Sequence, residues 1–239
     1  MAYQTVFKRY ELKYMLTEEQ KQKLLTAMEP YMKLDAYGRT TIRNIYFDTD
    51  NYRLIRRSIE KPAYKEKLRI RSYAQASTES PVFIELKKKY DSVVYKRRLC
   101  MNEKEAMEWI AENHNCEQET QISKEIAYFL DYYKDLRPAA FLSYEREAFY
   151  SLGGDDLRIT FDDHILCRQE SISLTEDVWG MELLEPGMVL MEIKCSGGIP
   201  LWLTQVLSEE RIYKTSFSKY GEAYQKIIFP KLKEATKNE

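Results

Sequence analysis

The sequence predicts an α+β fold, an eight-stranded antiparallel sheet that closes into a β-barrel and is flanked by helices. At least six segments alternate apolar and charged residues with the period of two that is typical of strands, most clearly Leu68-Arg69-Ile70-Arg71. Turn signals such as Gly153-Gly154-Asp155-Asp156 join neighbouring strands as hairpins. Helical segments between the strands are available to cover the apolar face of the sheet.

The N-terminal half supplies five of the expected strands and two helices. Thr17, followed by Glu18, Glu19 and Gln20, is the N-cap pattern of a helix that extends to about Tyr31. A second, short helix is expected at 52–58. The strands are expected at 3–15, 41–48, 63–74, 81–89 and 92–101, the last two joined at Tyr90-Asp91.

A helical insertion at about 103–135 separates these strands from the C-terminal ones, with helices at 103–113 and 122–133. Pro200 suits the first turn of a helix that continues to Leu207, and a last helix is expected at about 217–229, with a frayed tail after Pro230. Since no linker or repeat divides the chain, residues 1–239 are expected to form one domain. The remaining strands are expected at 139–150, 157–163 and 188–195, with shorter pieces up to 184.

Composition excludes several classes of protein. The 37 basic and 38 acidic residues give a formal net charge of −1, which argues against a nucleic-acid binder. The chain has neither the run of about 18 apolar residues of a membrane span nor an apolar signal-peptide core, so a cytoplasmic location is expected. With two histidines and four scattered cysteines, neither a histidine-based metal site nor a disulfide frame is expected.

The charged positions of the alternating strands are biased toward arginine and lysine. A barrel with these charges inside and helices against its apolar outside accommodates the pattern. Basic side chains gathered in a confined space repel one another and are costly to desolvate, so such a lining calls for a polyanion or a metal–anion complex. The alternative is a solvated polar face with scattered ion pairs, and the strand pattern by itself leaves it open.

Eight motifs follow one another in order along the chain: FKRYELKY (7–14), NIYFDT (44–49), KLRIR (67–71), VFIELK (82–87), SYEREAF (143–149), LRITFD (157–162), VLMEIK (189–194) and SFSKY (216–220). Together they resemble the VTC domain, the catalytic domain of the vacuolar transporter chaperone polyphosphate polymerase. That domain belongs to the triphosphate tunnel metalloenzyme, or CYTH-like, superfamily. The resemblance implies an eight-stranded tunnel that binds tri- or polyphosphate through basic side chains and a divalent metal.

Carried over position by position, the resemblance implies a substrate-binding set and a metal-binding set. Glu192 resembles the metal-binding carboxylate for Mn²⁺ or Mg²⁺, with Glu11 and Glu85 on matching strand faces as helpers or ion-pair partners. Lys219 lies in the motif near the growing polyphosphate end, and with Arg69 and Arg71 it is the expected catalytic group. The substrate-binding residues are expected to be Lys13, Arg69, Arg71, Lys87, Lys96, Arg98, Arg146, Arg158, Lys194, Ser218 and Lys219.

The chain also departs from the pattern typical of the hydrolytic members of the superfamily that it resembles. These begin with Glu-x-Glu-x-Lys, where this chain has Arg9-Tyr10-Glu11-Leu12-Lys13, and some carry a second acid where it has Glu192-Ile193-Lys194. Fewer acids favour the polymerase branch, in which the terminal phosphoryl group of ATP is transferred to inorganic polyphosphate. Export of that product is expected to need a separate membrane partner, which would place the enzyme at the inner face of the membrane.

Two alternatives stay open. One is a tripolyphosphatase or NTPase of the same fold, in which water is the phosphoryl acceptor. The other is a non-catalytic module that binds polyphosphate or an inositol phosphate.

Overall fold

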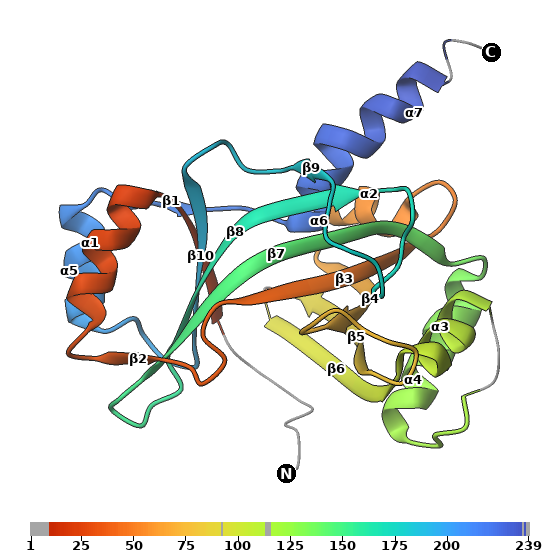
Figure 1. Ribbon diagram of the computed structural model, residues 1–239, viewed down its shortest axis with the longest axis horizontal. Helices are drawn as coiled ribbons and strands as arrows, with labels where there is room; N and C mark the ends of the chain where they lie inside the picture. The colour runs from red at the N-terminus through yellow and green to blue at the C-terminus, as the bar shows by residue number, and fades with distance from the viewer. Residues whose placement is uncertain (1–9, 92, 113–115, 236, 238–239) are drawn as a thin grey trace.

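An antiparallel sheet of eleven strands forms the centre of the structure (Figure 1). The structure is a computed structural model, and it describes residues 10–91, 93–112, 116–235 and 237. Its strands are β1 (Tyr10–Thr17), β2 (Met32–Leu34), β3 (Thr40–Asp48), β4 (Tyr64–Ser72), β5 (Pro81–Tyr90), β6 (Val93–Asn102), β7 (Arg137–Ser151), β8 (Arg158–Arg168), β9 (Met181–Glu182), β10 (Met188–Cys195) and β11 (Lys214–Thr215). They follow the order β11-β1-β10-β8-β7-β3-β4-β5-β6, while β2 pairs with β7 and β9 pairs with β8.

The helices are α1 (Glu18–Met28), α2 (Arg53–Ile59), α3 (Glu103–Glu112), α4 (Gln121–Tyr133), α5 (Leu201–Glu209), α6 (Lys219–Ala223) and α7 (Phe229–Ala235), and the π-helical turn Tyr224–Ile228 joins α6 to α7. The predicted N-cap of α1 is confirmed, because the Thr17 side chain accepts from the backbone N–H of Gln20 and the Gln20 side chain accepts from that of Thr17. The tail predicted to be frayed is helical as far as Ala235. Pro230 lies where the helical chain passes from the π-helical turn into α7.

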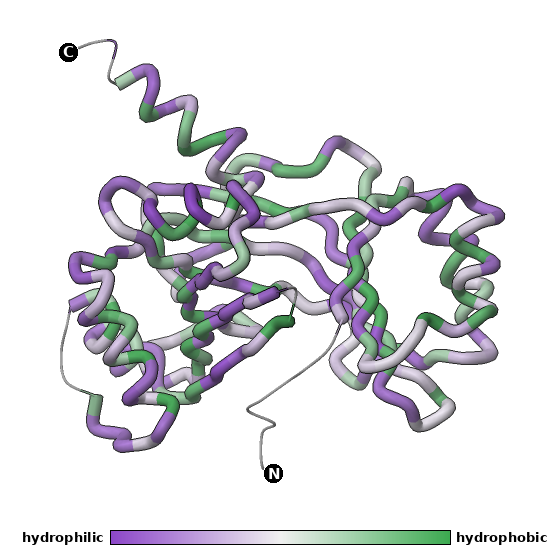
Figure 2. Tube along the Cα trace, turned by 180° about the vertical axis from the view of Figure 1, so that it is seen from behind, coloured by the Kyte–Doolittle hydropathy of each residue, from purple (hydrophilic) through white to green (hydrophobic). Residues whose placement is uncertain are grey.

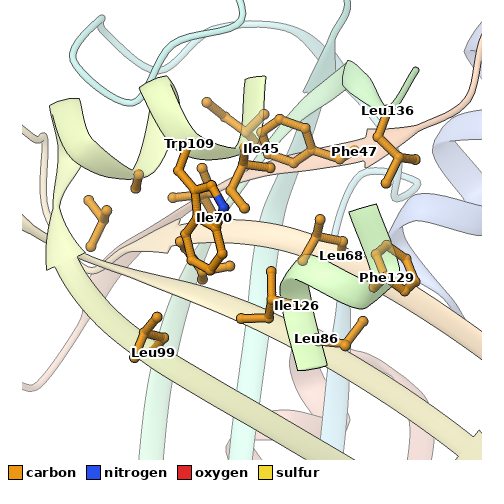
Figure 3. Packing of buried hydrophobic residues seen from close by; sticks show 14 of the residues in the cluster. Ile45, Phe47, Leu68, Ile70, Leu86, Leu99, Trp109, Ile126, Phe129 and Leu136 are labelled. Atoms are coloured by element: carbon orange, nitrogen blue, oxygen red, sulfur yellow. The ribbon is translucent and has the colours of Figure 1, made fainter. Parts of the chain in front are cut away.

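Helices cover the outward face of the sheet at both ends. Beneath α3 and α4, the outward side chains of β3 to β6 form a buried cluster, in which Figure 3 shows Trp109 near Ile70 and Phe129 near Leu68. At the other end, α1 and α5 cover β1, β8 and β10 (Figure 1). Burying each such side chain stabilises the fold by about 1.5–3 kcal/mol. This packing leaves the opposite face of the sheet to the charged residues.

The inward face carries a third apolar cluster at one end. Ile42 of β3 and Leu142 of β7 pack there against α6 and the π-helical turn, represented by Tyr220 and Ile227. The beginning of α6 therefore lies on the same face of the sheet as the alternating charged residues. Figure 2 shows hydrophilic and hydrophobic residues alternating along the strands.

The prediction of a closed eight-stranded barrel is wrong on two points. The sheet has eleven strands, and among the described residues no hydrogen-bonded ladder joins β6 to β1 or β11. Side chains connect the two sides instead, for example where Lys87 of β5 donates to Glu11 of β1 at 2.8 Å. Alternation in a sequence specifies which face of each strand is buried, but it carries no information about which edge strands meet.

Some predictions concern residues that the structure does not describe. The segment 3–9 of the first expected strand and position 113 of an expected helix lie outside the described residues. Among the helices that the structure describes, none combines the length and the hydrophobicity of a membrane span.

Candidate functional site

The charged side chains of the alternating strands meet on the inward face of the sheet, together with Lys219 from the start of α6. We call this set the basic interior, because its basic members far outnumber its acidic ones. Contacts reach from one side of the sheet to the other, as between Lys87 and Glu11. The set consists of Lys13, Lys67, Arg69, Arg71, Lys87, Lys96, Arg98, Arg146, Lys194 and Lys219, with Glu11, Glu85, Asp162 and Glu192.

Glu85 of β5 lies at the centre of the first charged group. Its side chain is 1% exposed and accepts from Arg69 Nη2 at 2.6 Å and from Arg98 Nε at 2.8 Å. Lys96 Nζ and Arg71 Nη1 approach the same carboxylate to 3.4 and 3.9 Å. Burial alone raises the pKa of Glu85, but these cations hold it well below its usual range. One carboxylate thus neutralises part of four positive charges.

Arg69 and Arg71 are also held by neutral groups. Arg69 Nη1 donates to the Tyr46 hydroxyl at 2.9 Å. Arg71 is buried, and it donates to Asn44 Oδ1 at 2.8 Å and to the Tyr144 hydroxyl at 2.7 Å. Neutral partners orient a guanidinium without cancelling its charge, so both arginines keep electrostatic attraction for an anion.

Asp162 and Glu192 form the centre of the second charged group. Asp162 is fully buried and accepts from Arg146 Nε and from Lys219 Nζ, each at 2.6 Å. Glu192 lies 3.2 Å from Lys13 Nζ and from Lys194 Nζ, and 3.5 Å from Lys219 Nζ. Burial alone lowers the pKa of Lys219, but the two carboxylates raise it above its ordinary value. Lys219 is therefore held as a cation between two strands.

Three successive residues at the start of α6 contact three different parts of the basic interior. The Phe217 carbonyl accepts from Lys13 Nζ at 2.7 Å, and Ser218 Oγ accepts from Lys67 Nζ at 2.8 Å. Lys219 contacts Asp162 and Glu192, as described above. The Ser218 hydroxyl also caps α6, because it accepts from the backbone N–H of Gly221 at 3.1 Å. The chain at 217–219 thus connects β1, β4, β8 and β10.

Several lysines of the basic interior lose protons more readily than an exposed lysine. Burial, with help from neighbouring cations, lowers the pKa of Lys67 to about 7. Burial also lowers the pKa of Lys96 to about 8, although Glu85 opposes the shift. The pKa values of Lys13 and Lys194 are lowered for the same reason. An entering anion would favour the protonated form of all four, so the interior is suited to binding multiple negative charges.

Not all predicted site residues come together. Arg158, at the start of β8, is exposed and pairs with Asp35 at 3.2 Å, away from the two charged groups. Glu11 pairs with Lys87, and its pKa is lowered to about 2 by Lys87 and Lys194 despite its burial. The other predicted substrate-binding residues, from Lys13 to Lys219, belong to the basic interior or, in the case of Ser218, contact it.

The three carboxylates expected to bind metal lie apart. Glu85 belongs to the first charged group, Glu192 belongs to the second, beside Asp162, and Glu11 pairs with Lys87. Among the described residues no group of three or more histidine, cysteine, aspartate or glutamate side chains is placed to hold a metal ion. Asp162 and Glu192 are the two carboxylates that lie together, and each also contacts Lys219. Two carboxylates, with phosphate oxygens and water, are a ligand set that suits Mg²⁺ or Mn²⁺, and an ion bound here would share them with Lys219.

Reasoning from the sequence missed two members of the basic interior, Lys67 and Asp162. Lys67 has the same strand phase as Arg69 and Arg71, and that phase is the signal that marks it. Asp162 is expected to end a strand, but β8 continues to Arg168, so this expectation is wrong and Asp162 lies within the strand. Asp162 lies two residues after Thr160 and so on the same face of the strand, and this position is the signal that marks it. Both residues are found by extending the alternation by one more step.

Two solved structures share this fold. A candidate adenylate cyclase from Bacillus halodurans aligns with a TM-score of 0.56 at 16% identity, over 90% of this chain and 96% of its own. A candidate adenylyl cyclase from Hippeastrum, described as having a dominant triphosphatase activity, aligns with a TM-score of 0.53 at 17% identity, over 92% of this chain and 96% of its own. A search of curated proteins gave no match.

A sequence-family comparison covers the basic interior as a whole. The VTC domain matches residues 8–228, from before Glu11 to beyond Lys219. The match therefore includes both charged groups and the segment at the start of α6. It confirms the resemblance that the eight motifs carry, and the chain belongs to the VTC domain family.

Proposed function

We propose that this chain is a polyphosphate polymerase, which transfers the terminal phosphoryl group of ATP to a polyphosphate chain within the basic interior. Its family and fold make it a phosphate-handling enzyme. The observation that carries the finer proposal is the composition of the interior, in which basic side chains converge from several strands and the carboxylates are already paired. A long polyanion matches this excess of positive charge.

Phosphoryl transfer needs positioning and charge neutralisation more than it needs a protein nucleophile. Arg69, Arg71 and Arg146 have planar forks that suit phosphate oxygens, and lysines add point charges. Because these groups now bind Glu85 and Asp162, an entering phosphate chain has to share them with the carboxylates. Lys219 would orient the terminal phosphate of the growing chain. A bound Mg²⁺ or Mn²⁺ beside Asp162 and Glu192 would neutralise charge on the transferred group.

A hydrolase of the same fold is the second candidate, favoured by the triphosphatase activity described for the Hippeastrum protein. In that reaction water replaces polyphosphate as the acceptor. The paired carboxylates of the interior weigh against it. Asp162 and Glu192 both contact Lys219, so neither is free to act as a base toward water. For this reason the transferase remains our proposal.

The test is to incubate the protein with ATP and Mn²⁺ and to analyse the products by gel electrophoresis and phosphate release. Long-chain polyphosphate with ADP supports the polymerase. Free phosphate with ADP as the only products would replace it with the hydrolase. Salt-sensitive polyphosphate binding without turnover would leave a binding module.

A matched pair of variants links the product to the site. Lys219→Met removes the ammonium group that contacts Asp162, and it should abolish turnover. Lys231→Met removes an exposed lysine whose partner is Glu170, and it should retain turnover. Equal activity of the two variants would show that the reaction does not depend on Lys219 and would contradict the assignment of the reaction to the basic interior.

A further inference from the structure

The pair formed by Ser218 and Lys67 has a geometry that phosphate binding does not require. The two residues are 151 positions apart in the chain, and Lys67 Nζ lies 2.8 Å from Ser218 Oγ. The serine is half-buried. In this hydrogen bond the amine donates to the hydroxyl oxygen, and when the amine is neutral the same contact pairs a nucleophile with a base.

The surroundings of Lys67 favour its neutral, proton-accepting form. Its electrostatic neighbours are Lys13, Lys87, Lys65 and Arg69, all of them cations. In the described part of the chain, its hydrogen-bond partner is the Ser218 hydroxyl, in contrast to Lys219, which binds two carboxylates. Burial among like charges brings the pKa of Lys67 to about 7, so a large share of the amine is unprotonated at neutral pH.

The second hydrogen bond of Ser218 fixes the orientation of its hydroxyl. Ser218 Oγ accepts from the Gly221 N–H at 3.1 Å, so one lone pair is occupied by the helix cap. The hydroxyl proton is then free to point to Lys67 when that amine is neutral. The remaining lone pair is available for attack on phosphorus.

We propose that Ser218 is a phosphoryl acceptor, activated by Lys67, at which a nucleoside triphosphate starts a polyphosphate chain. The inference rests on the proposed polymerase function and adds the first acceptor to it. Ser218 Oγ forms a bond to the γ-phosphorus, the bond from that phosphorus to the β,γ-bridging oxygen breaks, and the nucleoside diphosphate leaves. The hydroxyl proton moves to Lys67 Nζ. A terminal oxygen of the resulting phosphoserine is the acceptor for the next transfer.

Basic side chains surround the position at which the phosphoserine would form. A phosphoserine at this position adds negative charge and three acceptor oxygens beside Lys67, which has become a cation by taking the proton. Lys13 is also close, because it donates to the carbonyl of the preceding residue, Phe217. Such charge-assisted hydrogen bonds hold the phosphoryl group inside the site. The same contacts place its terminal oxygens where the chain is extended.

The experiment is to incubate the protein briefly with limiting ATP and Mn²⁺ and to locate the added phosphoryl group by tandem mass spectrometry. We expect phosphate or a short phosphate chain on Ser218. Ser218→Asn should remove it, and since asparagine is a good N-cap the start of α6 is kept. Ser218→Thr keeps a hydroxyl and should be labelled. Ser216→Ala, which removes an exposed hydroxyl two residues away, is the matched control and should be labelled on Ser218 as in the wild type.

The role of Lys67 is tested by pH. The labelling rate should rise with pH and then level off, because the neutral amine is the reactive form. Since the bound nucleotide favours the protonated amine, the inflection should lie above the value of about 7 for the ligand-free site. Lys67→Met should slow labelling by about 10²-fold or more, the usual contribution of a general base, and should flatten the pH profile. A profile that keeps its inflection in this variant would overturn the role of Lys67.

A primer separates this inference from the proposed function. For the wild type, polyphosphate synthesis from ATP alone should begin without a lag, whereas Ser218→Asn should show a lag that added short-chain polyphosphate shortens. If the wild type makes polyphosphate but carries no phosphate on Ser218, the inference fails and the polymerase stands. If the wild type makes no polyphosphate even with primer, the polymerase fails. Labelled Ser218 in that case would support phosphoryl transfer to Ser218 but would overturn its role in starting a chain.

Discussion

Replacing Glu85 with glutamine should destabilise the protein strongly, because this one buried carboxylate contacts four cations. Its side chain is 1% exposed, and its nearest charged contacts are Arg69 at 2.6 Å and Arg98. Removing one partner of a buried ion pair costs about 3–5 kcal/mol, since the remaining charge stays buried without compensation. For a chain of this size about 1 kcal/mol corresponds to roughly 2–4 °C in Tm, so a fall of roughly 6–20 °C is expected.

The assay is thermal unfolding followed by circular dichroism, with and without tripolyphosphate. Glu79→Gln is the matched control, because it makes the same change at an exposed site and should alter stability by no more than about 0.5 kcal/mol. Tripolyphosphate should raise the Tm of Glu85→Gln by more than it raises the Tm of the wild type, because it supplies the negative charge that the variant lacks. If both glutamate variants melt together, Glu85 does not hold the cations and the reasoning is wrong.

The pH dependence of this difference has a definite sign. The pKa of Glu85 is held well below its usual range, so its contribution to stability is fully present above the unfolded-state value. It declines as pH falls below the unfolded-state pKa and is gone once pH has fallen through the lower folded-state pKa. The difference in Tm between wild type and Glu85→Gln should therefore be constant from about pH 6 to 8 and shrink in acid.

Three further predictions concern the ligands. Arg71→Ala should weaken polyphosphate binding, measured by calorimetry, by about 10–100-fold, which corresponds to the loss of a hydrogen bond to a charged group. The control Arg137→Ala removes an exposed arginine paired with Asp50 and should change the affinity by less than about threefold. Glu192→Ala should abolish metal-dependent turnover in a Mn²⁺ titration, and full activity would move the metal elsewhere. Polyphosphate binding should weaken as pH rises through about 7, because Lys67 loses its proton there. Calorimetry in two buffers should detect proton uptake on binding. Binding without proton uptake would contradict the lowered pKa of Lys67.

Most of the strands and helices could be predicted because their signals are local. The alternation of Leu68 and Ile70 with Arg69 and Arg71 specifies a strand with one apolar and one basic face, and the structure has β4 there. The N-cap at Thr17 is equally local. Strand ends are less well determined, and β8 continues past the expected end at 163 because the pairing with β7 extends to Arg168.

The candidate site is only partly accessible from the sequence. The basic residues are identified by strand phase and by resemblance, but their partners are not. Nothing local indicates that Lys87 binds Glu11, or that Lys67 reaches Ser218 across 151 residues. These contacts depend on the order of strands in the sheet, which a single sequence does not reveal.

The sequence by itself determined that basic side chains share one face of several strands, because side-chain direction in a strand follows from the backbone alone. Only the tertiary structure decided which charges meet, where Asp162 lies, and that within the described residues no ladder joins β6 to β11 or β1. The physical reason is that electrostatic energy and pKa depend on distance and burial. Lys67 and Lys219 are both lysines of the basic interior, yet burial among cations lowers the pKa of one and two carboxylates raise that of the other.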